Sequence, residues 1–274
     1  MRTANTPRSG GYVHGYAEPE TRRLGDQANT LAALLHTGTA YPAGSRVLEV
    51  GCGVGAQTAH LLAGSPAARF VSMDLAAASL ARARAHLSPH PRVSWCRADL
   101  FDPPFAGGSF DHLFLCFVLE HLAHPVEALA GLRRVLRPGG SITVIEGDHG
   151  SAVFHPDSAQ ARAAIGCQVR LQAAAGGNAL VGRQLQPLLA GAGYREVRVR
   201  PRTVYADQTR PDLVDGFTRN TFTAMVAAVR DDVVAAGFST RAAFDRGVAD
   251  LHRTGESGGT FHYTFFKAVA VNPG

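Results

Sequence analysis

Residues 47–58, VLEVGCGVGAQT, join a hydrophobic run, an acid and a glycine-rich turn. Gly51, Gly53 and Gly55 would let the backbone of such a turn approach a ligand closely. A glycine turn between a strand and a helix is typical of sites for nucleotide-like ligands. Glu49 stands two residues before the first glycine, where its charge would oppose a phosphate near the start of the helix. The stretch therefore favours a ligand with a ribose and a cationic centre but no phosphate.

Acids also end the next two expected strands. Asp74 is the next-to-last residue of the stretch 68–75, ARFVSMDL, and Asp99 is the next-to-last residue of the stretch 92–100, RVSWCRADL. Either acid alone could simply cap the next helix. Because the carboxyl ends of parallel strands meet along one sheet edge, where open α/β sheets bind ligands, we expect both carboxylates at a shared ligand site.

A candidate base lies just past the strand expected at residues 141–147. His149, in EGDHG, would stand at the same sheet edge and could accept a proton from an acidic substrate group. The alternative is a loop histidine bonded to backbone. His149 is therefore both the candidate catalytic residue and a candidate substrate contact.

Aromatic and polar residues elsewhere could form a pocket for an organic substrate. Three groups carry them: the segment GYVHGY before the first helix, the residues after the fifth strand, and the stretch GFTRNTF. Aromatic residues on helices more often belong to a core. The candidate substrate contacts are Tyr12, His14, Phe154, His155, Phe217, Asn220 and Phe222.

The elements that position these residues alternate between strands and helices. Strands are expected at residues 46–50, 68–75, 92–100, 109–118 and 141–147, with helices between them. Such alternation predicts a parallel sheet with helices on both faces. Two more strands are expected, at 194–207 and 260–272, so the fold class is α/β, a doubly wound, mostly parallel sheet of seven strands.

Helical patterns at residues 213–237 and 240–254 fall between the last two expected strands. So long an insertion between neighbouring strands suggests a cap over the ligand crevice. The expected divisions are a disordered tail at 1–11, an N-terminal lid and helix at 12–44, a ligand-binding core at 45–206, a helical cap at 207–258 and the last core strand at 259–274.

With these motifs in order, residues 45–148 resemble a class I S-adenosylmethionine-dependent methyltransferase with a Rossmann-like fold. The resemblance implies that the glycine turn holds S-adenosylmethionine, which leaves as S-adenosylhomocysteine. It implies that Asp74 takes the ribose hydroxyls and that Asp99, with Leu100, reads the adenine. It also places Cys116 and Phe117, at the end of the fourth strand, beside the methionine portion.

Gln27 on the first helix is a candidate hydrogen-bond partner for the methionine carboxylate, or an exposed helical glutamine. Tyr16 belongs to the segment that in similar enzymes folds over the cofactor as a lid. The full set of expected cofactor contacts is Tyr16, Gln27, Glu49, Gly51, Cys52, Gly53, Gly55, Asp74, Leu75, Asp99, Leu100, Cys116 and Phe117.

The acceptor class is narrowed by motifs that are missing. The fourth strand ends in CFVLEH, without the (N/D)PP(Y/F) tetrapeptide by which nucleobase-amine methyltransferases resemble one another, and no Pro-Cys nucleophile is present. The chain is more similar to methyltransferases of ubiquinone and menaquinone biosynthesis and of secondary metabolism. We therefore expect a small organic acceptor and no nucleic acid. The alternatives are an RNA or protein methyltransferase, a non-catalytic cofactor-binding protein, and a nicotinamide dehydrogenase.

Composition sets the remaining expectations. The chain of 274 residues has a net charge of +5 and a sequence pI near 9.3, but its basic residues are scattered among acids. The four cysteines show no disulfide framework and no zinc-type spacing, so no metal is expected. We expect a cytoplasmic protein without a membrane segment, because no apolar stretch approaches the roughly 20 residues of a membrane span. The oligomeric state is left open.

Overall fold

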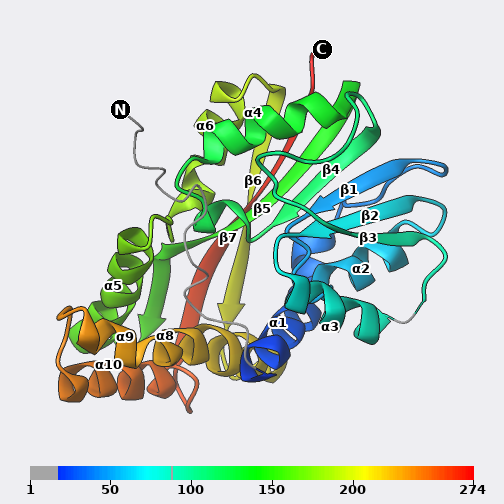
Figure 1. Ribbon diagram of the computed structural model, residues 1–274. Coiled ribbons are helices and arrows are strands. Elements are labelled where there is room, and N and C mark those ends of the chain that lie inside the picture. Colours follow the sequence, from blue (N-terminus) through cyan, green and yellow to red (C-terminus); the bar gives the residue numbers. More distant parts are fainter. Residues whose placement is uncertain (1–17, 88) are drawn as a thin grey trace, which may run out of the picture.

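The computed structural model of the protein describes residues 18–87 and 89–274 (Figure 1). Tyr12, His14 and Tyr16 and the tail expected at residues 1–11 lie outside the described residues.

A single sheet organises the described chain, and its strands lie in the order β3-β2-β1-β4-β5-β7-β6. The first five strands run parallel, while β7 is antiparallel to both β5 and β6. This arrangement confirms the mostly parallel, seven-stranded α/β fold. The strands are β1 (Arg46–Val50), β2 (Arg69–Asp74), β3 (Val93–Arg97), β4 (Phe110–Cys116), β5 (Leu136–His155), β6 (Arg195–Ala206) and β7 (Thr260–Val271).

Helices cover both faces of the sheet (Figure 1). One apolar cluster joins a sheet face to α1, α2, α5 and the helices that follow β6, and a second cluster joins the other face to α4 and α6. The helices are α1 (Glu18–His36), α2 (Ala56–Gly64), α3 (Ala77–Leu87), η1 (Leu119–His121), α4 (Pro125–Val135), α5 (Ala159–Ala174), η2 (Val181–Gln184), α6 (Leu185–Gly191), α7 (Pro211–Leu213), η3 (Val214–Thr223), α8 (Ala224–Ala228), α9 (Arg230–Ala235) and α10 (Arg241–Arg253).

The fifth strand is much longer than the expected segment 141–147. It begins at Leu136, directly after α4, and ends at His155. Its pairing with β7 shifts register between Asp148 and Val153, which marks a bulge, and then resumes. The long partner strand β7 supplies the pairing that extends β5 past the glycines and polar residues around position 150.

The helical segment between β6 and β7 is broken rather than continuous. The expected helix at 213–237 forms α7, η3, α8 and α9 in turn, and η3 is a π-helix. A π-helix has more residues per turn than an α-helix, and single turns of it occur often at functional sites. It therefore changes which side chains of this segment share a face.

The π-helix packs closely against the first helix at Gly216. A Cβ atom at Gly216 would collide with the Thr30 hydroxyl and lie 2.8 Å from the Thr30 methyl carbon. This glycine thus lets η3 and α1 come together over the sheet edge.

We expect Gly216→Ala to lower the free energy of unfolding by about 1–3 kcal/mol, the usual cost of overpacking. Urea unfolding of the wild type, Gly216→Ala, Thr30→Ala and the double variant measures it. The double variant should recover most of the loss, because Thr30→Ala removes the colliding atoms. Gly166→Ala is the matched control, since a Cβ there meets nothing within 4 Å. An equal loss in both glycine variants would contradict the contact.

Candidate functional site

A cavity of about 280 Å³ opens at the carboxyl edge of β1, β2, β3 and β4. The ends of those strands form one side, α1 contributes Leu24 and Gln27, and η3 with α8 contributes Phe217, Phe222 and Met225. Gly147 and His149 of β5 and Tyr263 of β7 form the deep end. The segment expected to be a cap therefore contributes side chains to the same cavity as the glycine turn.

The glycine turn is held by the neighbouring strand end. The N–H groups of Gly51 and Cys52 both donate to the Met73 carbonyl, at 2.8 and 3.0 Å. Gly51 has φ +69°, and a Cβ there would lie 2.7 Å from a methyl carbon of Val118. Gly51, Cys52 and Gly53 line the cavity, whereas Gly55 is buried behind it and faces Ala83.

Glu49 lies beneath the turn and does not line the cavity. Its Oε2 accepts hydrogen bonds from the hydroxyls of Thr58 and Ser72, both at 2.6 Å. The pKa of Glu49 is raised to about 7: burial and the nearby charge of Asp74 raise it by more than the two hydroxyl hydrogen bonds lower it. In this position the Glu49 carboxyl links β1, which carries it, to Ser72 of β2 and Thr58 of α2.

The raised pKa of Glu49 predicts a pH dependence of stability. In the unfolded chain this carboxyl titrates near 4.5, so between about pH 4.5 and 7 the folded state holds more protons than the unfolded state. The free energy of unfolding should therefore fall as pH rises through this window. Urea unfolding at about pH 5, 6 and 7 should show a weaker decline in Glu49→Gln than in the wild type. The exposed Glu256→Gln should keep the wild-type decline, and a wild-type decline in Glu49→Gln would contradict the prediction.

Asp74 and Asp99 stand at successive strand ends and both line the cavity. Backbone N–H groups hold the Asp74 carboxylate on both oxygens: Gly53 donates to Oδ2 and Ala76 to Oδ1, each at 2.8 Å. Asp99 Oδ1 accepts from the Phe101 N–H at 2.9 Å. Each acid thus begins the turn after its strand and also faces the cavity, so the capping and ligand-binding interpretations are compatible. Leu75 and Leu100 line the cavity beside them.

The other end of the cavity is aromatic. Phe117, which adopts φ +59°, has its ring 5.6 Å from that of Phe265. Phe217 and Phe222 from η3 lie 5.5 and 5.4 Å from the Tyr263 ring. These four phenylalanines, with Cys116 at the end of β4, line an apolar chamber.

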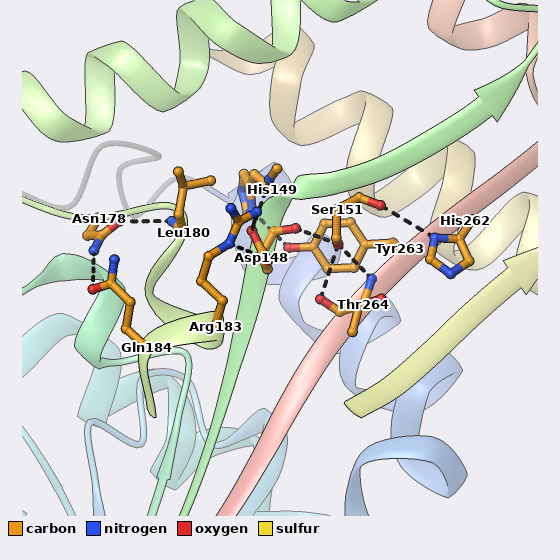
Figure 2. A network of polar contacts seen from close by, with 11 residues as sticks. Asp148, His149, Ser151, Asn178, Leu180, Arg183, Gln184, His262, Tyr263 and Thr264 are labelled. Atoms are coloured by element: carbon orange, nitrogen blue, oxygen red, sulfur yellow. Dashed lines mark hydrogen bonds and ion pairs between the residues drawn. The ribbon is translucent and has the colours of Figure 1, made fainter. Parts of the chain in front are cut away.

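His149 enters this chamber from the bulge of β5 (Figure 2). The side chain is 6% exposed, and its Nδ1 lies 2.8 Å from the Tyr263 hydroxyl oxygen. Its Nε2 is buried without a hydrogen-bond partner. Burial lowers the pKa of His149, while the charges of Glu120 and Asp148 raise it and those of Arg23 and His121 lower it. The imidazole is therefore neutral at neutral pH.

A polar network fixes the backbone that carries His149 (Figure 2). Arg183 of η2 binds Asp148 with two hydrogen bonds, Nε to Oδ2 at 2.8 Å and Nη2 to Oδ1 at 2.7 Å. The His149 N–H donates to the Ala179 carbonyl at 3.0 Å. A bidentate pair fixes the relative orientation of its two groups. The pair of Arg183 and Asp148 therefore holds the bulge in position and also balances the negative charge of Asp148.

Several expected contacts lie elsewhere. Asn220 is exposed and outside the cavity lining, because in the π-helix Phe217, Thr221 and Phe222 face inward. Phe154 stacks on Phe261 in the core and His155 is exposed, both beyond the bulge and outside the lining.

The sequence interpretation also missed lining residues. Tyr263, Phe265, Met225 and Glu120 come from segments that were treated as core, cap or helix, whereas Thr221 lies in the stretch GFTRNTF that was expected to contribute to the pocket. The alternation of TFHYTFF in the last strand places Phe261, Tyr263 and Phe265 on one face and could have indicated an aromatic surface.

Within residues 18–87 and 89–274, no group of three or more His, Cys, Asp or Glu side chains is placed to hold a metal ion. No helix in the described part of the chain is long and apolar enough to cross a membrane. The four cysteines are free.

Comparison with known proteins agrees with this geometry. Residues 48–144 match a family described as "Methyltransferase domain". An uncharacterized 37.1 kDa protein from a Streptomyces fradiae transposon is 35% identical over 191 residues, covering 67% of this chain and 53% of that protein. A demethylmenaquinone methyltransferase of Clavibacter sepedonicus is 36% identical over 104 residues, covering 38% of this chain and 42% of the enzyme. The chain thus spans about half the length of these relatives, or less.

A solved structure shares the fold across most of the chain. It is the Haemonchus contortus phosphoethanolamine N-methyltransferase 2, in complex with phosphomonomethylethanolamine and S-adenosylhomocysteine. Its TM-score is 0.56 at 17% identity, over 90% of this chain and 53% of that one. The glycine turn, the acids at successive strand ends and the matched family together identify residues 48–144 as a methyltransferase domain of the S-adenosylmethionine-dependent class.

Proposed function

We propose that this protein transfers a methyl group from S-adenosylmethionine to a small organic acceptor held beneath the helices between β6 and β7. The observation that carries the proposal is one cavity joining two chemically different ends. Asp74 and Asp99 stand at one end, and a chamber of aromatic side chains with one neutral histidine stands at the other.

The residues present fit the cofactor. The Asp74 carboxylate, oriented by two backbone N–H groups, keeps acceptor capacity for a ribose diol. Asp99 and Leu100 would border the adenine, and the glycine turn with Cys116, Phe117 and Gln27 would hold the methionine portion. When bound, S-adenosylmethionine supplies an electrophilic methyl group on a sulfonium. No phosphate-binding group is required, which agrees with the buried Glu49 beneath the turn.

The aromatic chamber supports a small, apolar acceptor. Phe217, Phe222 and Phe265 would exclude water and hold the acceptor against the methyl group, and positioning accounts for much of the catalysis of such a displacement. An RNA or protein acceptor would have to reach this chamber past the π-helix η3, which contributes Phe217 and Phe222. The similarity to a demethylmenaquinone methyltransferase supports a ring-bearing acceptor of the quinone kind.

Two measurements test the proposal. Isothermal titration calorimetry should show binding of S-adenosylhomocysteine and none of NAD. Incubation with methyl-labelled S-adenosylmethionine and a library of small aromatic compounds should then label at least one of them. Binding of NAD alone would support the dehydrogenase alternative. Labelling of tRNA or protein, without labelling of small molecules, would support the polymer alternatives.

A further inference from the structure

The contact between Tyr263 and His149 depends on Gly147, the glycine of β5 that faces the Tyr263 hydroxyl. Tyr263 is 2% exposed, and a Cβ atom at Gly147 would collide with its hydroxyl. With glycine there, the hydroxyl lies over β5 and reaches His149 Nδ1 at 2.8 Å. Residues from two strands thus form one buried pair at the deep end of the cavity.

Hydrogen-bond chemistry sets the direction of this contact. Burial raises the pKa of the Tyr263 phenol well above its usual value, so the hydroxyl keeps its hydrogen. The hydroxyl hydrogen remains available to donate. Because a phenol is a stronger donor than an imidazole N–H, and an imidazole nitrogen is a stronger acceptor than a phenol oxygen, Tyr263 donates to Nδ1.

This direction determines what His149 offers to a ligand. A neutral imidazole whose Nδ1 accepts carries its hydrogen on Nε2. The Nε2 atom is buried and has no partner in the described chain, and a buried donor left unpaired is costly. The titratable groups that face the ring are Tyr263, Glu120, Asp148, Arg23 and His121.

We propose that His149 donates a hydrogen bond from Nε2 to the acceptor oxygen, that Tyr263 is the positioning residue which fixes this tautomer, and that the acceptor is an ionised hydroxyl on an aromatic body. The proposal rests on the proposed methyl transfer. It revises the general-base role expected of His149, because a nitrogen that already carries hydrogen cannot take the acceptor's proton.

The resulting step balances without a base. The hydroxyl loses its proton to solvent before it enters, and a lone pair on the oxygen then forms the O–CH₃ bond. The C–S bond breaks and its electron pair stays on sulfur. The negative charge of the oxygen and the positive charge of the sulfonium cancel, which suits an apolar chamber in which isolated charges are costly.

The tautomer is measured without cofactor or turnover. Nitrogen-15 NMR of the histidine-labelled protein should show Nε2 of His149 protonated and Nδ1 unprotonated. In Tyr263→Phe the preference should weaken or reverse, and His112, whose Nδ1 contacts Ser141 away from the cavity, should keep its signals as the internal control. A hydrogen on Nδ1 in the wild type would overturn the proposal.

The donor role is tested with 2-naphthol and the protein saturated with S-adenosylhomocysteine. Above the pKa of this probe, its anion should shift the His149 Nε2 proton resonance downfield, whereas 2-naphthylamine should not. The absence of any shift with 2-naphthol would overturn the proposal.

Once an aromatic acceptor is found, turnover measurements distinguish a hydrogen-bond donor from a general base at His149. His149→Ala should lower kcat/KM about 10- to 150-fold, the range for losing a hydrogen bond to a charged group. His149→Gln, which can donate but cannot act as a base, should recover most of that loss. Equal losses in both variants would overturn the donor role, whereas failure to methylate any small molecule would contradict the proposed function and leave the tautomer result standing.

Discussion

Replacing Asp74 by alanine should weaken the binding of S-adenosylhomocysteine by about 1.5–3 kcal/mol, or roughly 10- to 150-fold in Kd. The proposed ribose contacts go to a charged acceptor, and such hydrogen bonds are stronger than neutral ones. The variant also loses the bonds from the Gly53 and Ala76 N–H groups, so the glycine turn keeps its bonds to the Met73 carbonyl but loses its side-chain contact with β2.

Calorimetry with S-adenosylhomocysteine measures this effect, and urea unfolding shows how much of it reflects a weakened fold. Asp74→Asn should bind with intermediate affinity, because one carbonyl oxygen remains. Asp212→Ala is the matched control, since this acid is exposed on α7 and outside the cavity lining. An affinity for Asp74→Ala equal to that of the wild type would refute the ribose role.

The alternation of apolar strands and helices was sufficient to predict the fold between residues 45 and 148. Buried parallel strands are continuous apolar runs, and RVLEV and the run ending at Asp74 are easily recognised. The extension of β5 to His155 was not predictable, because the polar residues after Gly147 pair only through the remote strand β7. Helix α5, at residues 159–174, also went unpredicted, since its hydrophobic pattern is weak.

The proposed cofactor end of the site was more predictable than the proposed acceptor end. Asp74 and Asp99 mark strand ends, and chain order alone places consecutive strand ends on one edge. The acceptor end depends instead on contacts between segments far apart in the chain, such as His149 with Tyr263. Asn220 was chosen for the mixed aromatic and polar composition of GFTRNTF, which does not say which side chains share a face; residues 214–223 form a π-helix whose inward face carries Phe217, Thr221 and Phe222.

Gly51→Ala should destabilise the protein by about 2–5 kcal/mol, for two separable reasons. A non-glycine residue in the left-handed region costs about 1–2 kcal/mol, and Gly51 has φ +69°. The new Cβ would also lie 2.7 Å from a methyl carbon of the buried Val118, and overpacking adds about 1–3 kcal/mol.

Gly53→Ala is the matched control, because Gly53 has φ +53° but a Cβ there meets nothing within 4 Å. Gly53→Ala should lower the free energy of unfolding only by the cost of the left-handed backbone conformation. It should also bind S-adenosylhomocysteine more weakly, because the new side chain would enter the cavity. In urea unfolding, Gly51→Ala combined with Val118→Ala should recover the overpacking part and retain the backbone part. If Gly51→Ala and Gly53→Ala proved equally destabilised, the contact with Val118 would have no energetic weight, and the first glycine of the turn would be required for its backbone conformation alone.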